Sequence, residues 1–214
     1  MSKEEKVINF YILCNILKNT IRTGWKDWNV SKERLESVAE HIFGAQMLAI
    51  AIKSEFEYDI DIMKVIYMLA IHELGETIIE DIPPFKMSAS EKERIEHEAV
   101  HKILKDLLDG EQIEEMFLEF DERCTKEALF AYECDKLEAD LQSKIYDEEG
   151  YVDVKNQKGN IAMKDPMVKL LLTKGYSFGQ MWLKYSKYRY PYDNNFQSIS
   201  DYATNNMILK KRNS

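Results

Sequence analysis

The chain has 214 residues, 45% of them hydrophobic, so it can bury the core of one domain with appended elements. Its 38 acidic side chains outnumber 29 basic ones and give a formal net charge of −9, which argues against nucleic acid polymers as partners. A small phosphorylated metabolite is still compatible with this charge, because a bound cation and one or two basic groups can outweigh it locally.

The sequence predicts an all-α fold. The chain contains only 8 Gly and 4 Pro, and its apolar residues recur at three- and four-residue steps. We expect helices over residues 3–19, 35–54, 60–73, 90–108, 111–122, 124–147, 165–173, 177–188 and 195–209.

No segment predicts a membrane span or a secretory signal. The longest uncharged runs, residues 7–17 and 42–52, are shorter than the roughly 18 residues that a membrane span needs. The charged start of the chain lacks the apolar core of a signal peptide. We therefore expect a soluble, cytoplasmic protein with no membrane partner.

The three cysteines, Cys14, Cys124 and Cys134, are odd in number and widely spaced. This pattern fits neither a disulfide framework nor a thiolate zinc site. We interpret all three as small buried hydrophobic residues.

Two loops between the predicted helices are candidates for function. Residues 20–34 are rich in tryptophan and basic residues, and residues 80–89 contain the run Asp-Ile-Pro-Pro. Loops framed by rigid helices are where functional groups tend to collect.

Two histidines lie on predicted apolar helix faces. His41 shares a stripe with Val38, Ala45, Leu48 and Ile52, and His72 follows Val65, Met68 and Leu69. Both are therefore expected to point inward. Taken alone, each is either a core residue whose nitrogens are satisfied or a metal ligand.

The helix predicted over residues 90–108 begins at a capping box formed by Ser90 and Glu93. It also contains a formal H-E-x-x-H match, with histidines at 97 and 101, which is the zinc motif of many metalloproteases. Both histidines project from the edge of the apolar stripe toward its charged side, whereas a protease needs them in a buried cleft with a third ligand. An amphipathic surface helix is the simpler interpretation.

Asp135 lies on a helix face without other charges, together with Ala128, Ala131, Tyr132, Ala139 and Gln142. Burying its carboxylate without a partner would cost several kcal/mol, so a lysine, an arginine or a metal ion is required. One cation would satisfy this carboxylate together with His41, His72 and Glu73, which favours a metal site of two imidazoles and two carboxylates.

Such a site suits one divalent transition metal, either Mn, Co, Fe, Ni or Zn. If coordination positions stay open, the ion lowers the pKa of a bound water and polarises a phosphoryl oxygen. Glu76, four residues after His72, is placed to exchange protons with that water or with a leaving alcohol.

The polar, glycine-containing stretch over residues 148–164 indicates a boundary. We expect a core domain over residues 1–150 and a helical, aromatic-rich extension over 151–214. The aromatic side chains of the extension either pack on the core or a second subunit, or stack on a ligand: Trp182, Tyr185, Tyr188, Tyr190 and Tyr192.

Four segments together resemble the HD-domain metal-dependent phosphohydrolases, and within them the 5′-deoxynucleotidase branch. The segments are Arg-Thr-Gly-Trp at 22–25, Glu-Ser-Val-Ala-Glu-His at 36–41, His-Glu-Leu-Gly-Glu with Asp-Ile-Pro at 72–83, and Glu-Cys-Asp-Lys-Leu-Glu-Ala at 133–139. The resemblance covers about residues 8–147. The family's His-Asp pair is His72-Glu73 here, so the carboxylate stands one methylene further out.

The resemblance implies an HD-domain helical bundle and metal ligation by His41, His72, Glu73 and Asp135. It also implies catalytic roles for Glu76 and Asp81, substrate contacts from Arg22 with Trp25 nearby, and a homodimer. The implied reaction is hydrolysis of 2′-deoxyribonucleoside 5′-monophosphates to deoxynucleoside and phosphate.

Two other functions are compatible with the sequence. One is an HD-fold phosphohydrolase that acts on another phosphoester. The other is a non-catalytic helical interaction module with a structural metal, for which Glu73 in place of the usual aspartate is the main support. Glu76, Asp81 and Arg22 favour the enzyme, because a structural site would not need them.

Overall fold

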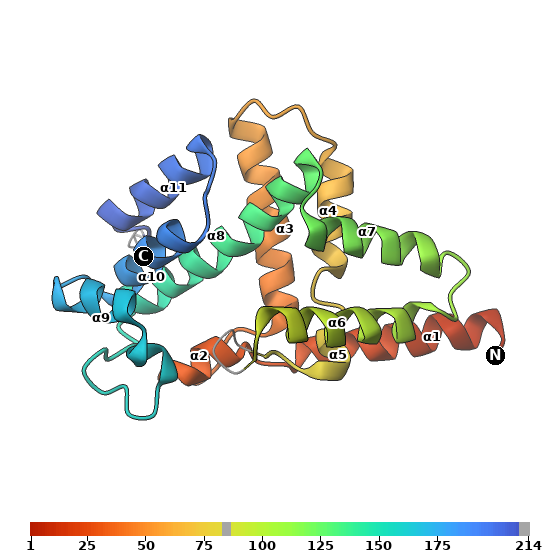
Figure 1. The fold of residues 1–214 in the computed structure, drawn as a ribbon, viewed down its shortest axis with the longest axis horizontal. Helices are drawn as coiled ribbons and strands as arrows, with labels where there is room; N and C mark the ends of the chain where they lie inside the picture. Colours follow the sequence, from red (N-terminus) through yellow and green to blue (C-terminus); the bar gives the residue numbers. More distant parts are fainter. Residues whose placement is uncertain (83–86, 210–214) are drawn as a thin grey trace, which may run out of the picture. The chain divides into compact units, whose positions relative to one another are not determined.

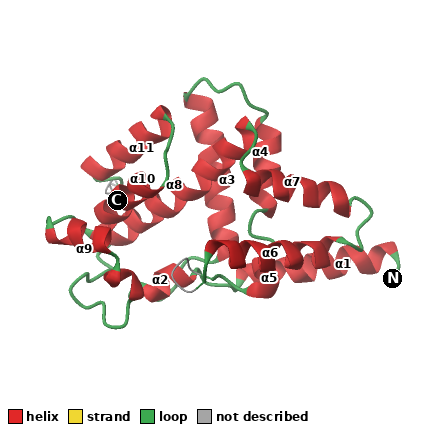
Figure 2. Ribbon diagram, viewed as in Figure 1, coloured by secondary structure: helices red, strands yellow, loops and turns green. Residues whose placement is uncertain are grey.

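The structure is a computed structural model that describes residues 1–82 and 87–209. Within this part of the chain every regular element is a helix (Figures 1 and 2), and the only strand-like feature is an isolated antiparallel bridge between Ile21 and Ser37. The predicted all-α fold is therefore confirmed. Pro83, in the predicted Asp-Ile-Pro-Pro loop, lies outside the described residues.

The elements follow one another along the chain as helices joined by short connections. They are α1 (Lys3–Cys14), η1 (Asn15–Lys18), α2 (Thr23–Asp27), α3 (Val38–Glu55), α4 (Ile62–Ile71), α5 (Glu76–Ile79), α6 (Ala89–Leu104), α7 (Gly110–Glu122), α8 (Lys126–Glu148), η2 (Ile161–Lys164), α9 (Pro166–Thr173), α10 (Phe178–Arg189) and α11 (Asn194–Asn205). None of the helices in residues 1–82 and 87–209 combines the length and the apolar content that crossing a membrane requires.

The long helices lie close to their predicted ranges, whereas the short elements α2, α5 and η2 lie outside every predicted helix, and η1 was predicted as the end of the first one. Four or five residues contain too few apolar repeats to show a helical period. The predicted capping box at Ser90 is wrong: Ser88 caps α6 and accepts a hydrogen bond from the backbone N–H of Glu91. Ser88 and Glu91 have the same spacing as the predicted pair.

The chain divides into two compact units. Unit 1 comprises residues 1–23 and 36–135, and unit 2 comprises residues 24–35 and 136–214. This division differs from the boundary expected near residue 150, because Trp25 and Trp28 belong to the same buried cluster as Tyr146. The tryptophan-rich loop therefore packs with residues more than a hundred positions later in the sequence.

In unit 1, α3 packs against α4, and α6 packs against α7. The second of these contacts encloses a cluster that includes Leu74, Val100, Leu104 and Phe117. Capping fixes where the helices begin: Ser37 and Glu40 form a capping box at the start of α3, and the Asp61 carboxylate caps α4.

In unit 2, aromatic side chains form a large part of the core. The Trp25 ring lies 5.3 Å from that of Tyr146 and 5.2 Å from that of Trp182, measured between centroids. Burial of such large rings accounts for much of a small core's stability. Trp182 and Tyr185 pack on this cluster, as the packing interpretation of the extension expects, whereas Tyr188 is exposed.

All three cysteines are free in the structure. Cys134 is buried and Cys14 is partly buried, but Cys124 is exposed. The interpretation of Cys124 as a buried residue was therefore wrong, because it lies in the short connection between α7 and α8.

Candidate metal centre

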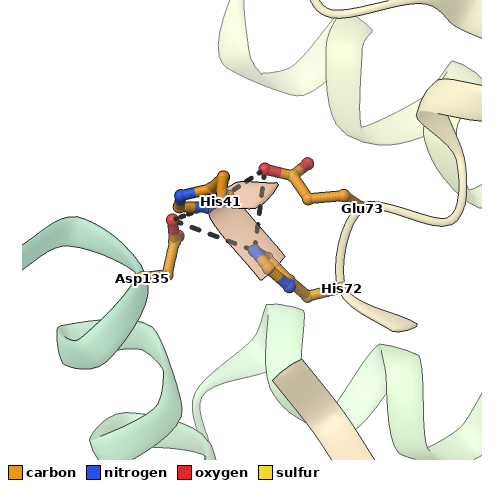
Figure 3. Close-up of side chains that lie close together, drawn as sticks. All are labelled: His41, His72, Glu73 and Asp135. Carbon is orange, nitrogen blue, oxygen red and sulfur yellow. Dashed lines mark hydrogen bonds and ion pairs between the residues drawn. The ribbon is translucent and has the colours of Figure 1, made fainter. Parts of the chain in front are cut away.

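Four side chains from separate parts of unit 1 converge on one point (Figure 3). His41 projects from α3, His72 and Glu73 follow the end of α4, and Asp135 projects from α8. All four are buried, and each offers one ligand atom within 4.8 Å of the other three. The set is the one that the sequence singled out as candidate ligands.

Local structure explains how each group reaches this point. His41 has no exposed surface and shares the inward face of α3 with Val38 and Ala45, as its spacing predicted. The predicted helix over residues 60–73 instead stops at Ile71, and His72 to Gly75 form a turn. This turn separates Glu76 from α4 and makes it the first residue of α5.

The distances between the four groups match a coordination sphere. His41 Nε2 lies 3.1 Å from Asp135 Oδ1 and 3.7 Å from Glu73 Oε1, and His72 Nε2 lies 3.9 Å and 3.6 Å from the same two oxygens. Ligands about 2.1 Å from one ion lie about 3.0–3.4 Å from one another in octahedral or tetrahedral geometry. A small contraction would therefore bring all four atoms into contact with one ion.

His72 presents a ligand atom in the correct state. Its Nδ1 lies 2.9 Å from the Leu69 carbonyl oxygen, and because a carbonyl only accepts, Nδ1 must carry the hydrogen. The other nitrogen, Nε2, then holds a lone pair, and it is buried without a hydrogen-bond partner. Burial lowers the pKa of His72, so the ring is neutral at neutral pH. An imidazole held by a carbonyl in this way is a typical metal ligand.

Glu73 reaches the centre despite its extra methylene. Its Oε1 faces both imidazoles and also accepts a 2.8 Å hydrogen bond from Nη1 of Arg22. Burial opposes ionisation of this carboxyl, but the permanent charge of the Arg22 guanidinium favours it, and the pKa of Glu73 lies below the ordinary value. Glu73 is therefore an ionised ligand candidate.

Glu76 and Lys92 extend the site beyond the four ligand candidates. The Glu76 side chain is 1% exposed, its Oε1 lies 3.5 Å from Lys92 Nζ, and its Oε2 has no hydrogen-bond partner. Burial raises the pKa of Glu76 well above its ordinary value, and the charges of Glu73 and Asp81 raise it further. The Glu76 carboxyl therefore favours its protonated form more strongly than an ordinary glutamate does. Lys92 did not stand out in the sequence, because a lysine near the start of an amphipathic helix is ordinary.

Arg22 is positioned by two neighbouring segments. Its backbone N–H donates to the Glu36 carbonyl oxygen beside the Ile21–Ser37 bridge. The next residue, Thr23, donates its backbone N–H to the Asp81 carboxylate and its hydroxyl to the Asp81 carbonyl oxygen. Asp81 therefore anchors the Arg22 segment, and the catalytic role that the resemblance implies for it stays a prediction.

The electrostatics of the site favour an added cation. Arg22 interacts electrostatically with the carboxyl groups of Glu73, Asp81, Glu76 and Asp135. Lys92 faces three of these acids and Glu96 as well. The carboxyl groups around the site thus outnumber Arg22 and Lys92, and a divalent ion would add positive charge where these acids converge.

The structure also places Trp25 and the two histidines of the H-E-x-x-H match. Trp25 is 2% exposed in the core of unit 2, so its ring offers little area to a ligand, and its substrate contact stays a prediction. The H-E-x-x-H histidines bind separate acids on α7: His97 Nε2 lies 2.7 Å from Asp121, and His101 Nδ1 lies 3.0 Å from Glu114. They do not converge on a shared point, which agrees with a surface helix.

Gly75 allows α6 to approach this region closely. A Cβ atom at Gly75 would lie 2.7 Å from Cγ of Glu96, so any other residue would push Glu96 away. Burial raises the pKa of the Glu96 carboxyl to about 7, while Lys92 opposes the shift. Glu96 is therefore a partly buried acid that changes charge near neutral pH.

We predict that Glu96 makes the metal-free protein less stable as pH rises. The folded pKa of about 7 exceeds the ordinary value of 4.5, so between these values the folded state holds a proton that the unfolded state has released. The free energy of unfolding should fall through this interval by at most about 3 kcal/mol and then level off. Thermal unfolding from pH 4.5 to pH 8, with a chelator present, measures this decline.

Glu96→Gln should flatten the profile and be more stable than wild type at pH 8 but not at pH 4.5. Glu98→Gln, on the exposed side of the same helix, is the control and should keep the wild-type slope. Equal slopes in wild type and Glu96→Gln would contradict the assignment.

The fold and the site define the class of protein. A helical unit that gathers two histidines and two carboxylates around a space of ionic size, with further buried acids and cations beside it, is a hydrolase-type metal centre. The HD domain family matches residues 14–170, and the chain belongs to that family.

Two enzymes and one solved structure are similar to most of this chain. The 5′-deoxynucleotidase HDDC2 of Dictyostelium discoideum is 32% identical over 150 residues, which are 66% of this chain and 78% of the relative. The 5′-deoxynucleotidase hdd1 of Schizosaccharomyces pombe is 31% identical over 153 residues, 68% and 75% of the two chains. The solved structure of a conserved hypothetical protein from Pyrococcus furiosus superposes with a TM-score of 0.59 at 28% identity, covering 73% of this chain and 92% of that one.

Proposed function

We propose that the protein is a metal-dependent phosphohydrolase that converts 2′-deoxyribonucleoside 5′-monophosphates to deoxynucleosides and phosphate. The observation that carries the proposal is the buried cluster of His41, His72, Glu73 and Asp135, in which the unpartnered Nε2 of His72 faces two carboxylates. The two 5′-deoxynucleotidases, which are 32% and 31% identical to this chain over the aligned residues, support the substrate class.

The four residues would hold one ion of Mn, Co, Fe, Ni or Zn, which are the metals that mixed imidazole and carboxylate ligands accept. When bound, this ion supplies an acidified water and polarises the phosphoryl group. Glu73 accepts a hydrogen bond from Arg22 on the oxygen that faces both imidazoles, so the guanidinium fixes the direction of that oxygen.

The remaining residues would act on the phosphate and on protons. Arg22 and Lys92 supply positive charge for the phosphate oxygens, as clamps do in other phosphoryl-transfer sites. Glu76, protonated by its buried position, gives its proton to the 5′ oxygen as the phosphorus–oxygen bond breaks and water oxygen bonds to phosphorus. Asp81 keeps Arg22 in place through Thr23.

The test is phosphate release from a panel of deoxyribo- and ribonucleoside 5′-monophosphates and simple phosphomonoesters, by chelated protein and after addition of each metal. We expect turnover only with a transition metal and a preference for the deoxyribonucleotides. Turnover of another phosphoester in preference to all nucleotides would replace the substrate class. If no metal supports turnover, the proposed enzymatic function is wrong and a structural metal site is favoured.

A further inference from the structure

Helices α6 and α7 together carry a second group of possible metal ligands. Glu93 and His97 are four residues apart on α6, so they lie on one face of that helix, and Asp121 joins them from α7. Each of the three offers one ligand atom, and these atoms lie within 4.8 Å of one another. We call the three residues the outer triad. None of them is a ligand candidate of the buried centre.

The imidazole of the outer triad already points at a carboxylate. Nε2 of His97 lies 2.7 Å from Oδ2 of Asp121, and the ring stands edge-on to Phe117 with 5.8 Å between the ring centroids. The His97 side chain is 31% exposed, so an ion can reach it from solvent. A held ring that remains accessible is well suited to bind a metal ion.

An ion pair between His97 and Asp121 alone leaves Glu93 unexplained. In the part of the chain that the structure describes, no lysine or arginine forms an ion pair with the carboxylate of Glu93 or of Asp121. Two carboxylates held beside one imidazole repel each other, because they carry like charges. A divalent cation between them would bind both carboxylates and the ring, and would therefore satisfy all three groups.

The surroundings of the outer triad attract cations. Residues 89–122, which form α6, α7 and their connection, contain 12 acidic side chains and 4 basic ones, a net charge of −8 in a chain whose total is −9. A region of one charge raises the local concentration of ions of the opposite charge. One imidazole with two carboxylates suits Zn, Ni, Co or Cu, whereas Mg and Ca prefer oxygen ligands alone.

We propose that Glu93, His97 and Asp121 bind one transition-metal ion, such as zinc, and that this ion ties α6 to α7. Water would fill the remaining coordination positions, since three protein ligands leave a tetrahedral site open. Lys92 precedes Glu93 on α6, and its Nζ lies 3.5 Å from Oε1 of Glu76 beside the buried centre. The ion would therefore fix the helix that supplies Lys92.

The experiment is equilibrium dialysis of the full chain against zinc at neutral pH, with His97→Ala and Asp121→Asn as separate variants. Each variant should bind one zinc ion fewer per chain than wild type. Loss of a group behind a ligand weakens metal binding by about 10- to 100-fold, so loss of a ligand should raise the dissociation constant of this ion by about 100-fold or more. His101→Ala is the matched control, because His101 lies on the same helix, pairs with Glu114 and should not change zinc binding.

The His72→Ala variant separates the outer triad from the buried centre. It should lose the ion of the centre and keep the ion of the triad, and the double variant with His97→Ala should bind neither. Loss of an ion in His72→Ala but not in His97→Ala would overturn the outer triad and leave the buried centre intact. The reverse result would overturn the buried centre alone, so the two proposals can fail independently.

Wild-type zinc binding by folded His97→Ala and Asp121→Asn would overturn the proposal, as would an equal loss in His101→Ala. Circular dichroism checks that the variants fold. If they do not, nuclear magnetic resonance of the wild type decides, because zinc that binds the triad must shift the signals of the His97 ring. Signals of this ring that stay in place at saturating zinc would exclude the site.

Discussion

Replacing His72 with alanine should abolish metal-dependent phosphate release, lowering kcat/KM by a factor of about 1,000 or more. The Nε2 of His72 is the buried nitrogen without a partner, and its removal leaves three ligand candidates for the ion. The measurement combines phosphate release with the metal content of the purified protein. Both should fall together, because the ring is proposed to act only by holding the ion.

His101→Ala is the matched control for this variant. His101 is an exposed histidine that pairs with Glu114 on α7, so its loss should change neither turnover nor metal content. Wild-type turnover in a folded His72→Ala protein would exclude the metal centre from the reaction. Loss of turnover with full metal content would show that the four-ligand assignment is wrong.

Replacing Glu76 with glutamine should lower kcat by about 100- to 10,000-fold and leave KM within a few fold of wild type. Glutamine keeps the shape of the side chain but cannot donate a carboxyl proton to the leaving oxygen. The variant should fold and should be about as stable as wild type, because a neutral amide replaces a carboxyl that is 1% exposed and whose neutral form burial favours. Steady-state kinetics and thermal unfolding measure the two effects separately.

Glu98→Gln controls for the loss of a carboxylate as such. Glu98 is exposed on α6 and pairs with Arg94 at the surface, so this change should leave kcat and stability near wild type. If Glu76→Gln turned over at the wild-type rate, the proton would have to come from elsewhere. If it lost metal instead of kcat, Glu76 would belong with the ligands.

The position of Glu73 shows how a departure from the family pattern is accommodated. The extra methylene does not remove the carboxylate from the centre, because its Oε1 stays within 3.7 Å of both imidazole nitrogens and is fixed by Arg22. The non-catalytic alternative relied on this substitution. The geometry removes that support, since the glutamate oxygen stands where a ligand is needed.

The amino-acid sequence by itself determined the long helices and the inward faces that carry His41 and Asp135. A helix repeats every 3.6 residues, so neighbours within a few turns reveal which side of it is buried. The ligand candidates could be found in the same way, because an ionisable group on an apolar face requires a partner. The separated motifs then indicated the family that the comparisons confirmed.

Only the tertiary structure decided which groups surround those ligands. Lys92 beside Glu76, Glu96 against Gly75, and Asp81 on Thr23 all join segments at least 16 residues apart. Trp25 lies in a core formed with Tyr146 and Trp182, which are more than a hundred residues away in the sequence. The helical periodicity of one segment does not predict its contacts with distant segments. Those contacts depend on how helices pack and on how closely a glycine lets two backbones approach.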